Sequence, residues 1–395
     1  MARYVIFTQS LFTERDWHRF GCQEFRDNGY EIVCVEVASA LGIPDKVRSQ
    51  GVFQSIRAIV APQDFAALEN IVLSLTKDDV VLMQVMLSDP TRHFFKVLYR
   101  HNVVYAAATM GPVPIFRMKR FRSALSLQEY VALKIADARS MLSRAKASLV
   151  QIAGRGLDYF QLQSPTYWLA VGAKPPAFAL YWPRLSGARR ISVPSYDYTA
   201  ARQVPAARAV SEKTAVFIDE AFPDHPDFQA LGRRSPVTRE RYWASLERLF
   251  KSIEAQTGLS VVIAPHPKSN GANPEINVRR WIAGKVTGEV IRDCALVISH
   301  SSTAVSFGVI FRKPIMFVTT DEVEASPYRA AIARISSCFG HRRINADRFA
   351  DADLQVPLVD EAVYQSYERE YLRGPDAIEG SPWAALRNEM KKNER

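Results

Sequence analysis

Apolar residues along this chain gather in short continuous runs rather than in strict alternation with polar ones. Continuous runs of this length are typical of strands that are buried on both faces of a parallel sheet. Between the runs lie segments whose apolar residues recur at three- and four-residue steps, as on one face of a helix. The pattern therefore predicts alternating strands and helices, an α/β fold.

The first half of the chain carries seven such runs. The predicted strands are 4–7, 31–37, 79–87, 103–109, 147–154, 167–173 and 189–195. A helix is expected to open at Thr13 and close at Gly29, and a longer one is expected over 126–147.

A polar, Ala/Arg-rich stretch at 198–213 is interpreted as a connection between domains. A second alternating series follows it, with strands expected over 214–220, 260–267, 294–302 and 313–320 and helices over 238–258, from Thr303, and over 381–395. We expect two Rossmann-like halves facing each other across a cleft. The predicted domains are 1–207, 208–375 and a C-terminal helix over 376–395.

The chain has 395 residues, 48% of them hydrophobic, and a net charge of +10, which suits two globular domains with an anionic partner. No nucleic-acid-binding motif accompanies the basic clusters, so nucleic acid is the weaker choice. Attraction to an anionic membrane surface fits the charge, and so does a merely basic, solvated surface.

No apolar stretch reaches the length of a membrane span, and the N-terminus is interpreted as a first buried strand rather than a signal peptide. The cysteines are scattered without a CxxC pair, which argues against a zinc site or a disulfide framework and fits a reducing cytoplasm. They are Cys22, Cys34, Cys294 and Cys338.

The strand expected at 260–267 ends abruptly in Pro265-His266-Pro267-Lys268. Proline fixes φ and removes a backbone donor, so the strand must stop here. His266 is thereby held at the carboxyl end of a strand, where open α/β sheets bind their ligands. The alternative is that His266 ends a strand and faces water.

The strand expected at 294–302 runs into His300, Ser301, Ser302 and Thr303 and then into a helix. Hydroxyl side chains at this boundary suit an N-cap. Three of them in a row exceed what one cap needs, and together with His300, His266 and Lys268 they could enclose the phosphate of a nucleotide. Neither a GxGxxG nor a GxxxxGK[ST] loop appears at a suitable strand–helix junction.

The strand expected at 214–220 delivers Asp219 and Glu220 at its carboxyl end, with His225 close behind. Acids that leave an apolar strand are costly unless they are solvated, paired or used. A solvated turn is one interpretation. The other is that Asp219 faces a cleft and takes part in catalysis, as a nucleophile, a base or a charge stabiliser, with Glu220 or Asp197 as the substitutes for this role.

The HP pair and the Ser-rich turn resemble the HP and S motifs of bacterial GT-B glycosyltransferases that use CMP-activated sugars. The order SYDY, IDE…HPD, HP, SS resembles the retaining β-Kdo transferases of O-antigen and capsule synthesis. This resemblance implies a GT-B fold, nucleotide phosphate bound by His266, Ser301 and Ser302, and an Asp219-linked sugar intermediate. CDP-glycerol polymerases carry a similar pair, but Ser299-His300 stands where they usually have aspartate and tyrosine.

Arg155 could bind a sugar carboxylate or be a surface arginine between turn glycines. Asp197 and Tyr198 could contact sugar hydroxyls or only cap the connection between the domains, and His225 is a further candidate for binding the sugar or the acceptor. Gln9, Ser10, Ser88, Asp89 and Arg92 lie at strand ends of the first half, where an acceptor would bind. No acidic pair indicates a metal site, so we expect metal-independent transfer. The resemblance implies that the donor is CMP-Kdo and that the acceptor is a lipid-linked glycan. We expect a cytoplasmic protein that is peripheral to the membrane.

Two further functions stay open. One is an inverting sialyl- or nonulosonate transferase that uses a carboxylate as general base, and the other is a non-catalytic subunit that binds a nucleotide sugar or polysaccharide.

Overall fold

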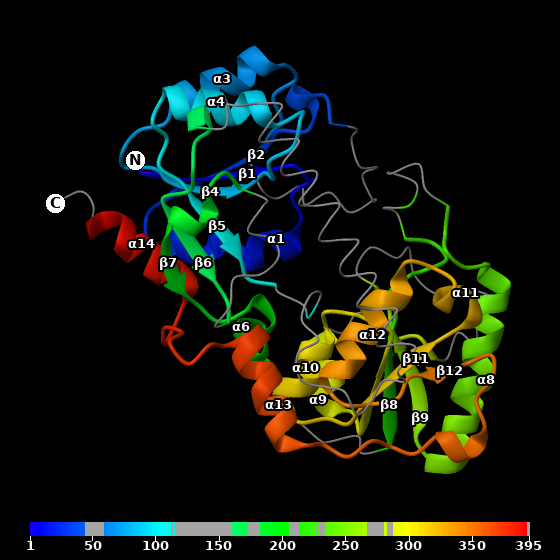
Figure 1. Ribbon diagram of the computed structural model, residues 1–395. Helices are drawn as coiled ribbons and strands as arrows, with labels where there is room; N and C mark the ends of the chain where they lie inside the picture. The colour runs from blue at the N-terminus through cyan, green and yellow to red at the C-terminus, as the bar shows by residue number, and fades with distance from the viewer. Residues whose placement is uncertain are drawn as a thin grey trace. The chain divides into compact units, whose positions relative to one another are not determined.

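The computed structural model describes residues 1–43, 59–111, 114, 160–172, 182–204, 213–225, 228, 234–266, 280–282 and 287–392. Its contacts divide the chain into two compact units, each built on a parallel β-sheet (Figure 1). Unit 1 comprises Met1–Pro112, Ser140–Tyr196 and Arg373–Arg395, and unit 2 comprises Val113–Arg139 and Asp197–Leu372. The sequence-based domain limits 1–207, 208–375 and 376–395 stay predictions.

Unit 1 holds a seven-stranded sheet in the order β3-β2-β1-β4-β5-β6-β7. The strands are β1 (Arg3–Thr8), β2 (Glu31–Glu36), β3 (Ile59–Val60), β4 (Val80–Gln84), β5 (Ala106–Thr109), β6 (Tyr167–Ala170) and β7 (Arg189–Ser192). Its helices are α1 (Glu14–Arg19), α2 (Cys22–Asp27), α3 (Phe65–Leu73), α4 (Arg92–Arg100) and α14 (Pro382–Lys392), with 3-10 turns η1 (Ser39–Leu41) and η4 (Leu185–Gly187). Six of the seven predicted strands are confirmed, and 147–154 lies outside the described residues, as does the helix expected over 126–147.

The helix expected from Thr13 to Gly29 is in fact two helices, α1 and α2, because the chain turns at Gly21. Gly21 adopts φ +64, and a Cβ atom there would lie 2.2 Å from the ring of Trp383. Trp383 belongs to α14, which packs onto α2 and buries this ring in the core of unit 1. The final helix therefore belongs to unit 1, and its packing against α2 requires the chain to turn at Gly21.

Unit 2 holds a five-stranded parallel sheet in the order β12-β11-β10-β8-β9. The strands are β8 (Thr214–Ile218), β9 (Ser260–Ala264), β10 (Leu296–Ser299), β11 (Ile315–Thr319) and β12 (Ile344–Asn345). The helices are α6 (Tyr196–Ala201), α8 (Arg239–Thr257), α9 (Thr287–Asp293), α10 (Val305–Ile310), α11 (Asp321–Glu324), α12 (Tyr328–Cys338) and α13 (Glu361–Tyr367), with a short 3-10 helix η6 (Asp351–Asp353) and a π-helix η7 (Glu368–Leu372). All four strands predicted for the second half are present.

Two apolar layers enclose the sheet of unit 2. On one face α8 buries Trp243, Leu246 and Phe250 against β8 and β9, as its three- and four-residue apolar spacing predicts. The other face packs on residues of α9, α10 and α13. Because both faces are covered, the sheet is left to meet solvent or a ligand at the ends of its strands.

Within the described ranges, no helix is both long enough and apolar enough to span a bilayer. All four cysteines are free thiols.

Candidate functional site

β8 is the middle one of three neighbouring strands, with β10 on one side and β9 on the other. In the ladder, Ile218 of β8 lies beside Ser299 of β10 and beside Ala264 of β9. All three strands are parallel, so their carboxyl ends meet at one edge of the sheet. The acids that follow β8 consequently lie between the Ser-rich turn after β10 and the proline-flanked histidine after β9.

Asp219 is almost completely buried, with 3% of its surface exposed. Its backbone N–H donates to the carbonyl of Ala264 at 3.0 Å, and its carboxylate accepts the N–H of Ala221 at 2.8 Å and the N–H of His266. Burial raises the pKa of Asp219 to about 6, because the two N–H donors offset only part of the cost of removing the charge from water.

Glu220 contacts the turn on the other side. The N–H of Ser301 donates to Oε1 of Glu220 at 2.5 Å, and the Ser301 hydroxyl donates to Oε2 at 2.9 Å. Burial raises the pKa of Glu220 to about 7 against the stabilising contacts of Ser301, and the charge of Asp219 raises it further. Buried Asp219 and partly buried Glu220 thus form an acidic pair that links the two neighbouring loops.

The rings of His225 and His266 pack against each other with centroids 4.7 Å apart. His225 also packs edge-on against Phe228. The backbone N–H of His266 donates to the carboxylate of Asp219. Two imidazoles therefore lie together at the β9 side of the acidic pair, as donors or acceptors for a ligand.

His300, which we expected to bind nucleotide, is instead a core residue. Its ring is fully buried, with Nδ1 2.8 Å from the carbonyl of Val318 and Nε2 2.8 Å from the hydroxyl of Tyr242. The carbonyl accepts only, so Nδ1 carries the proton and Tyr242 donates to Nε2. Burial lowers the pKa of His300 to about 4, and the neutral ring has both nitrogens occupied within the protein.

The remaining hydroxyls of the turn differ in their contacts. The N–H of Ser302 donates to the hydroxyl of Ser299 at 3.3 Å, and the Ser302 hydroxyl accepts the N–H of Ala304 at 3.3 Å, which tightens the chain ahead of α10. The side chain of Thr303 is exposed. Ser301 is therefore the hydroxyl that contacts an acid, while Ser302 caps the turn.

The other predicted site residues lie elsewhere or outside the described residues. Arg155 and Lys268 fall in undescribed segments. Asp197 and Tyr198 lie in the first turn of α6, where Tyr198 packs on the core of unit 2 and Asp197 acts electrostatically on Tyr367 of α13. Their contact with sugar hydroxyls stays a prediction.

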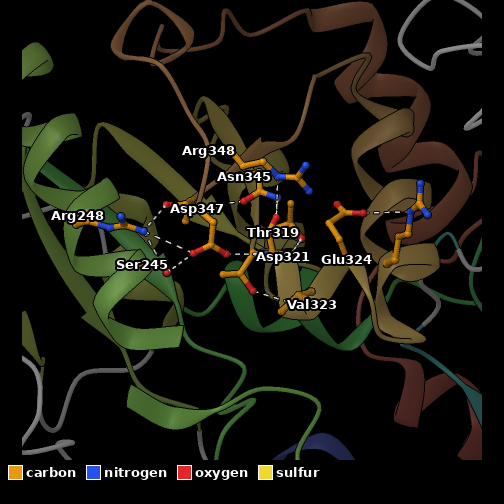
Figure 2. Close-up of polar contacts among 12 residues, drawn as sticks. Ser245, Arg248, Thr319, Asp321, Val323, Glu324, Asn345, Asp347 and Arg348 are labelled. Atoms are coloured by element: carbon orange, nitrogen blue, oxygen red, sulfur yellow. Dashed lines mark hydrogen bonds and ion pairs between the residues drawn. The ribbon is translucent and has the colours of Figure 1, made fainter. Parts of the chain in front are cut away.

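At the same edge of the sheet lies a second pair of acids, Asp321 and Asp347, each of which has an arginine partner (Figure 2). Beyond β11 and β12, Asp321 accepts from Asn345 at 2.9 Å and from Arg348 at 2.7 Å, and these contacts lower the pKa of Asp321. Asp347 accepts the N–H of Asp321 at 2.7 Å and lies 3.5 Å from Arg248. Within the described residues, Asp219 and Glu220 have no such arginine partner.

Tyr242 and Phe222 are the residues at this site that sequence reasoning did not single out. Tyr242 lies on the apolar face of α8, and Phe222 packs against both His300 and Tyr328. Helical spacing marks Tyr242 as a core residue, which it is, and gives no sign of its bond to His300. No group of three or more His, Cys, Asp or Glu side chains in the described ranges could hold a metal ion.

Comparisons with known proteins give the fold. No family model and no curated protein matches the sequence. Among solved structures, the wall teichoic acid polymerase TagF is similar over 99% of this chain and 89% of its own, with 9% identity and a TM-score of 0.53. A histidine variant of TagF gives a TM-score of 0.55 at 8% identity, over 99% of this chain and 88% of its own. The glycotransferase of kitacinnamycin covers 99% of this chain and 95% of its own at 13% identity, with a TM-score of 0.45.

At these identities the likeness to TagF concerns the fold. Together with the two parallel sheets, it confirms the predicted α/β architecture of the GT-B class, built from two Rossmann-like units.

Proposed function

We propose that this protein is a glycosyltransferase that moves Kdo, or a related 2-keto acid sugar, from its CMP-activated form to a bacterial surface glycan. The observation that supports this most directly is the meeting of Asp219, Glu220, His266 and Ser301 at one edge of unit 2. The GT-B fold is compatible with it. The net charge of +10 suits a peripheral position at an anionic membrane surface, close to a lipid-linked acceptor.

In this proposal the two loops that flank the acids bind the donor's anionic groups. Neighbouring strands lie about 4.8 Å apart, so the loops after β9 and β10 are about 10 Å apart across β8. That span leaves room for one phosphate group with hydrogen-bond donors on both sides. Ser301 and Ser302 would donate to the phosphate from one side, and His266, with Lys268, from the other.

Asp219 is the proposed nucleophile. Its carboxylate attacks the anomeric carbon, the bond from that carbon to the CMP oxygen breaks, and CMP leaves with the electron pair. The acceptor hydroxyl then displaces Asp219 from the same carbon and gives its proton to the released carboxylate of Asp219, which passes it on to solvent; the two inversions give retention. A pKa of about 6 keeps most Asp219 ionised at neutral pH, as a nucleophile requires. We propose transfer without a metal ion.

The test is CMP release by purified protein with CMP-Kdo and candidate glycan acceptors. Asp219→Asn should abolish release while leaving CMP binding intact. The matched control is Asp224→Asn, because Asp224 lies in the same loop but pairs with Arg239 at the surface. Intact-mass analysis of enzyme trapped with donor should show one added sugar on the wild type. Undiminished release by Asp219→Asn would refute the role of Asp219.

A second function keeps the same CMP site but inverts the sugar, with Asp219 as a general base in a sialyl- or nonulosonate transferase. The raised pKa of Asp219 favours this candidate equally, since a base works best with a pKa near the working pH. An anomerically inverted product, with CMP-Neu5Ac as the better donor, would select it. CMP binding without any turnover would instead select a non-catalytic subunit.

A further inference from the structure

The contact between Glu220 and Ser301 fixes the direction of two hydrogen bonds. Ser301 N–H lies 2.5 Å from Oε1, and Ser301 Oγ lies 2.9 Å from Oε2. An ionised carboxylate can only accept, so the serine hydroxyl must donate to Glu220 while Glu220 is charged. Both Ser301 donors are then used inside the protein, and a negative charge lies at the turn that would receive an anion.

The groups that face Glu220 come from every loop around it. Asp219 lies beside it and adds negative charge, and Ser302 approaches it with its N–H. From α8 comes Tyr242, whose pKa is raised by burial and by both acids. The neutral His300 precedes Ser301, and His266 ends the loop on the far side of Asp219. In the described part of the chain, no lysine or arginine pairs with Glu220.

We propose that Glu220 is a proton-operated positioning residue: an anion binds at the Ser301–Ser302 turn when Glu220 takes up a proton, and ionised Glu220 excludes it. The proton comes from solvent and adds to Oε2, which then donates to Ser301 Oγ. The bond between these oxygens reverses, so the serine hydrogen turns outward and can donate to the anion. Oε1 goes on accepting from the Ser301 N–H. The inference rests on the phosphate site of the proposed function but not on the transfer reaction.

The expected size of the effect follows from the raised pKa of this acid. With the pKa of Glu220 raised to about 7, the protonated fraction falls from about nine tenths at pH 6 to about one tenth at pH 8. An anion that binds only the protonated form loses apparent affinity in the same proportion, about tenfold.

Sulfate is the probe, since its charge stays constant between pH 6 and pH 8. Isothermal titration calorimetry on the full-length protein, in two buffers of different ionisation enthalpy, measures both affinity and proton uptake. The variant is Glu220→Gln, which can still accept from the Ser301 N–H. The matched control is Glu322→Gln, because Glu322 likewise accepts an N–H and a hydroxyl, both from Thr238, at 3.0 and 2.8 Å, but near the surface.

At pH 8, wild type and Glu322→Gln should take up about one proton more per sulfate than Glu220→Gln. Between pH 6 and pH 8 the sulfate affinity of wild type and Glu322→Gln should fall about tenfold, and that of Glu220→Gln should not show this fall. His225 and His266 are present in all three proteins, so their contribution cancels. Equal proton uptake in wild type and Glu220→Gln would overturn the inference, and so would the absence of sulfate binding from all three. If CMP-Kdo is not turned over while this linkage holds, the donor assignment fails and the inference stands.

Discussion

Asp219→Asn should change the stability of the protein in a way that depends on pH. The pKa of Asp219 is raised from 3.8 to about 6 by burial, so the native state binds a proton more readily than the unfolded chain. The free energy of unfolding therefore falls as pH rises from about 4 to about 6, and stays low above this range. Asparagine has no charge to bury and escapes this loss.

The magnitude follows from the shift. A difference of about 2 pKa units, at about 1.4 kcal/mol per unit, destabilises the wild type by about 3 kcal/mol at pH 8 and by about 0.5 kcal/mol at pH 4. The new amide N–H₂ of asparagine can lack a partner, which costs about 1–3 kcal/mol at any pH. This cost is the same at both pH values, so it cancels when the effect of the substitution at pH 4 is subtracted from its effect at pH 8. Between pH 4 and pH 8 the variant should therefore gain about 2.5 kcal/mol of stability relative to the wild type.

The assay is urea unfolding of the full-length wild type and variant at pH 4 and pH 8, followed by fluorescence. The control is Asp321→Asn, for which the opposite sign is expected. Asn345 and Arg348 lower the pKa of Asp321, so its carboxylate stabilises the fold above the unfolded-state pKa and loses this effect as pH falls. If Asp219→Asn gains no more stability at pH 8 than at pH 4, the burial argument is wrong.

Three further substitutions test the packing around the two sheets by chemical unfolding. His300→Ala should cost about 3 kcal/mol, because it opens a cavity and leaves the buried hydroxyl of Tyr242 without its partner; no loss would contradict the core role of this ring. Gly21→Ala should cost about 1–3 kcal/mol, since alanine at φ +64 is strained and its Cβ would overlap the ring of Trp383; an unchanged midpoint would show that α14 docks otherwise. Arg280→Ala should cost about 3 kcal/mol by leaving two partly buried glutamates without their cation; a neutral result would mean that water replaces it.

The sequence predicted the strands well because a strand buried on both faces must be apolar throughout, and this leaves a visible run. It did not predict β3 or β12, which are only two residues long. Such strands form because a neighbour is already in place to pair with them, as β11 pairs with β12. That neighbour is far away in sequence, so no local pattern announces the pairing.

The candidate site was predictable in part for the same reason. Polar residues that follow apolar runs collect at the carboxyl edge of a parallel sheet, which brings Asp219, His266 and Ser301 to one edge. The order of the strands was not visible. Because β8 lies between β9 and β10, the acids contact both loops instead of lying opposite them. The sequence also could not show that His300 turns into the core, since the residue after a strand can face either way.

The most direct test of the proposed site is calorimetric titration of CMP into wild type, His266→Ala and His101→Ala. His101 is an exposed histidine of unit 1 and serves as the control. Wild type and His101→Ala should bind CMP with the same affinity, and His266→Ala should bind it at least about tenfold more weakly, the loss expected for one charge-assisted hydrogen bond to phosphate. Equal affinity in all three proteins, or binding of UDP in preference to CMP, would contradict the account.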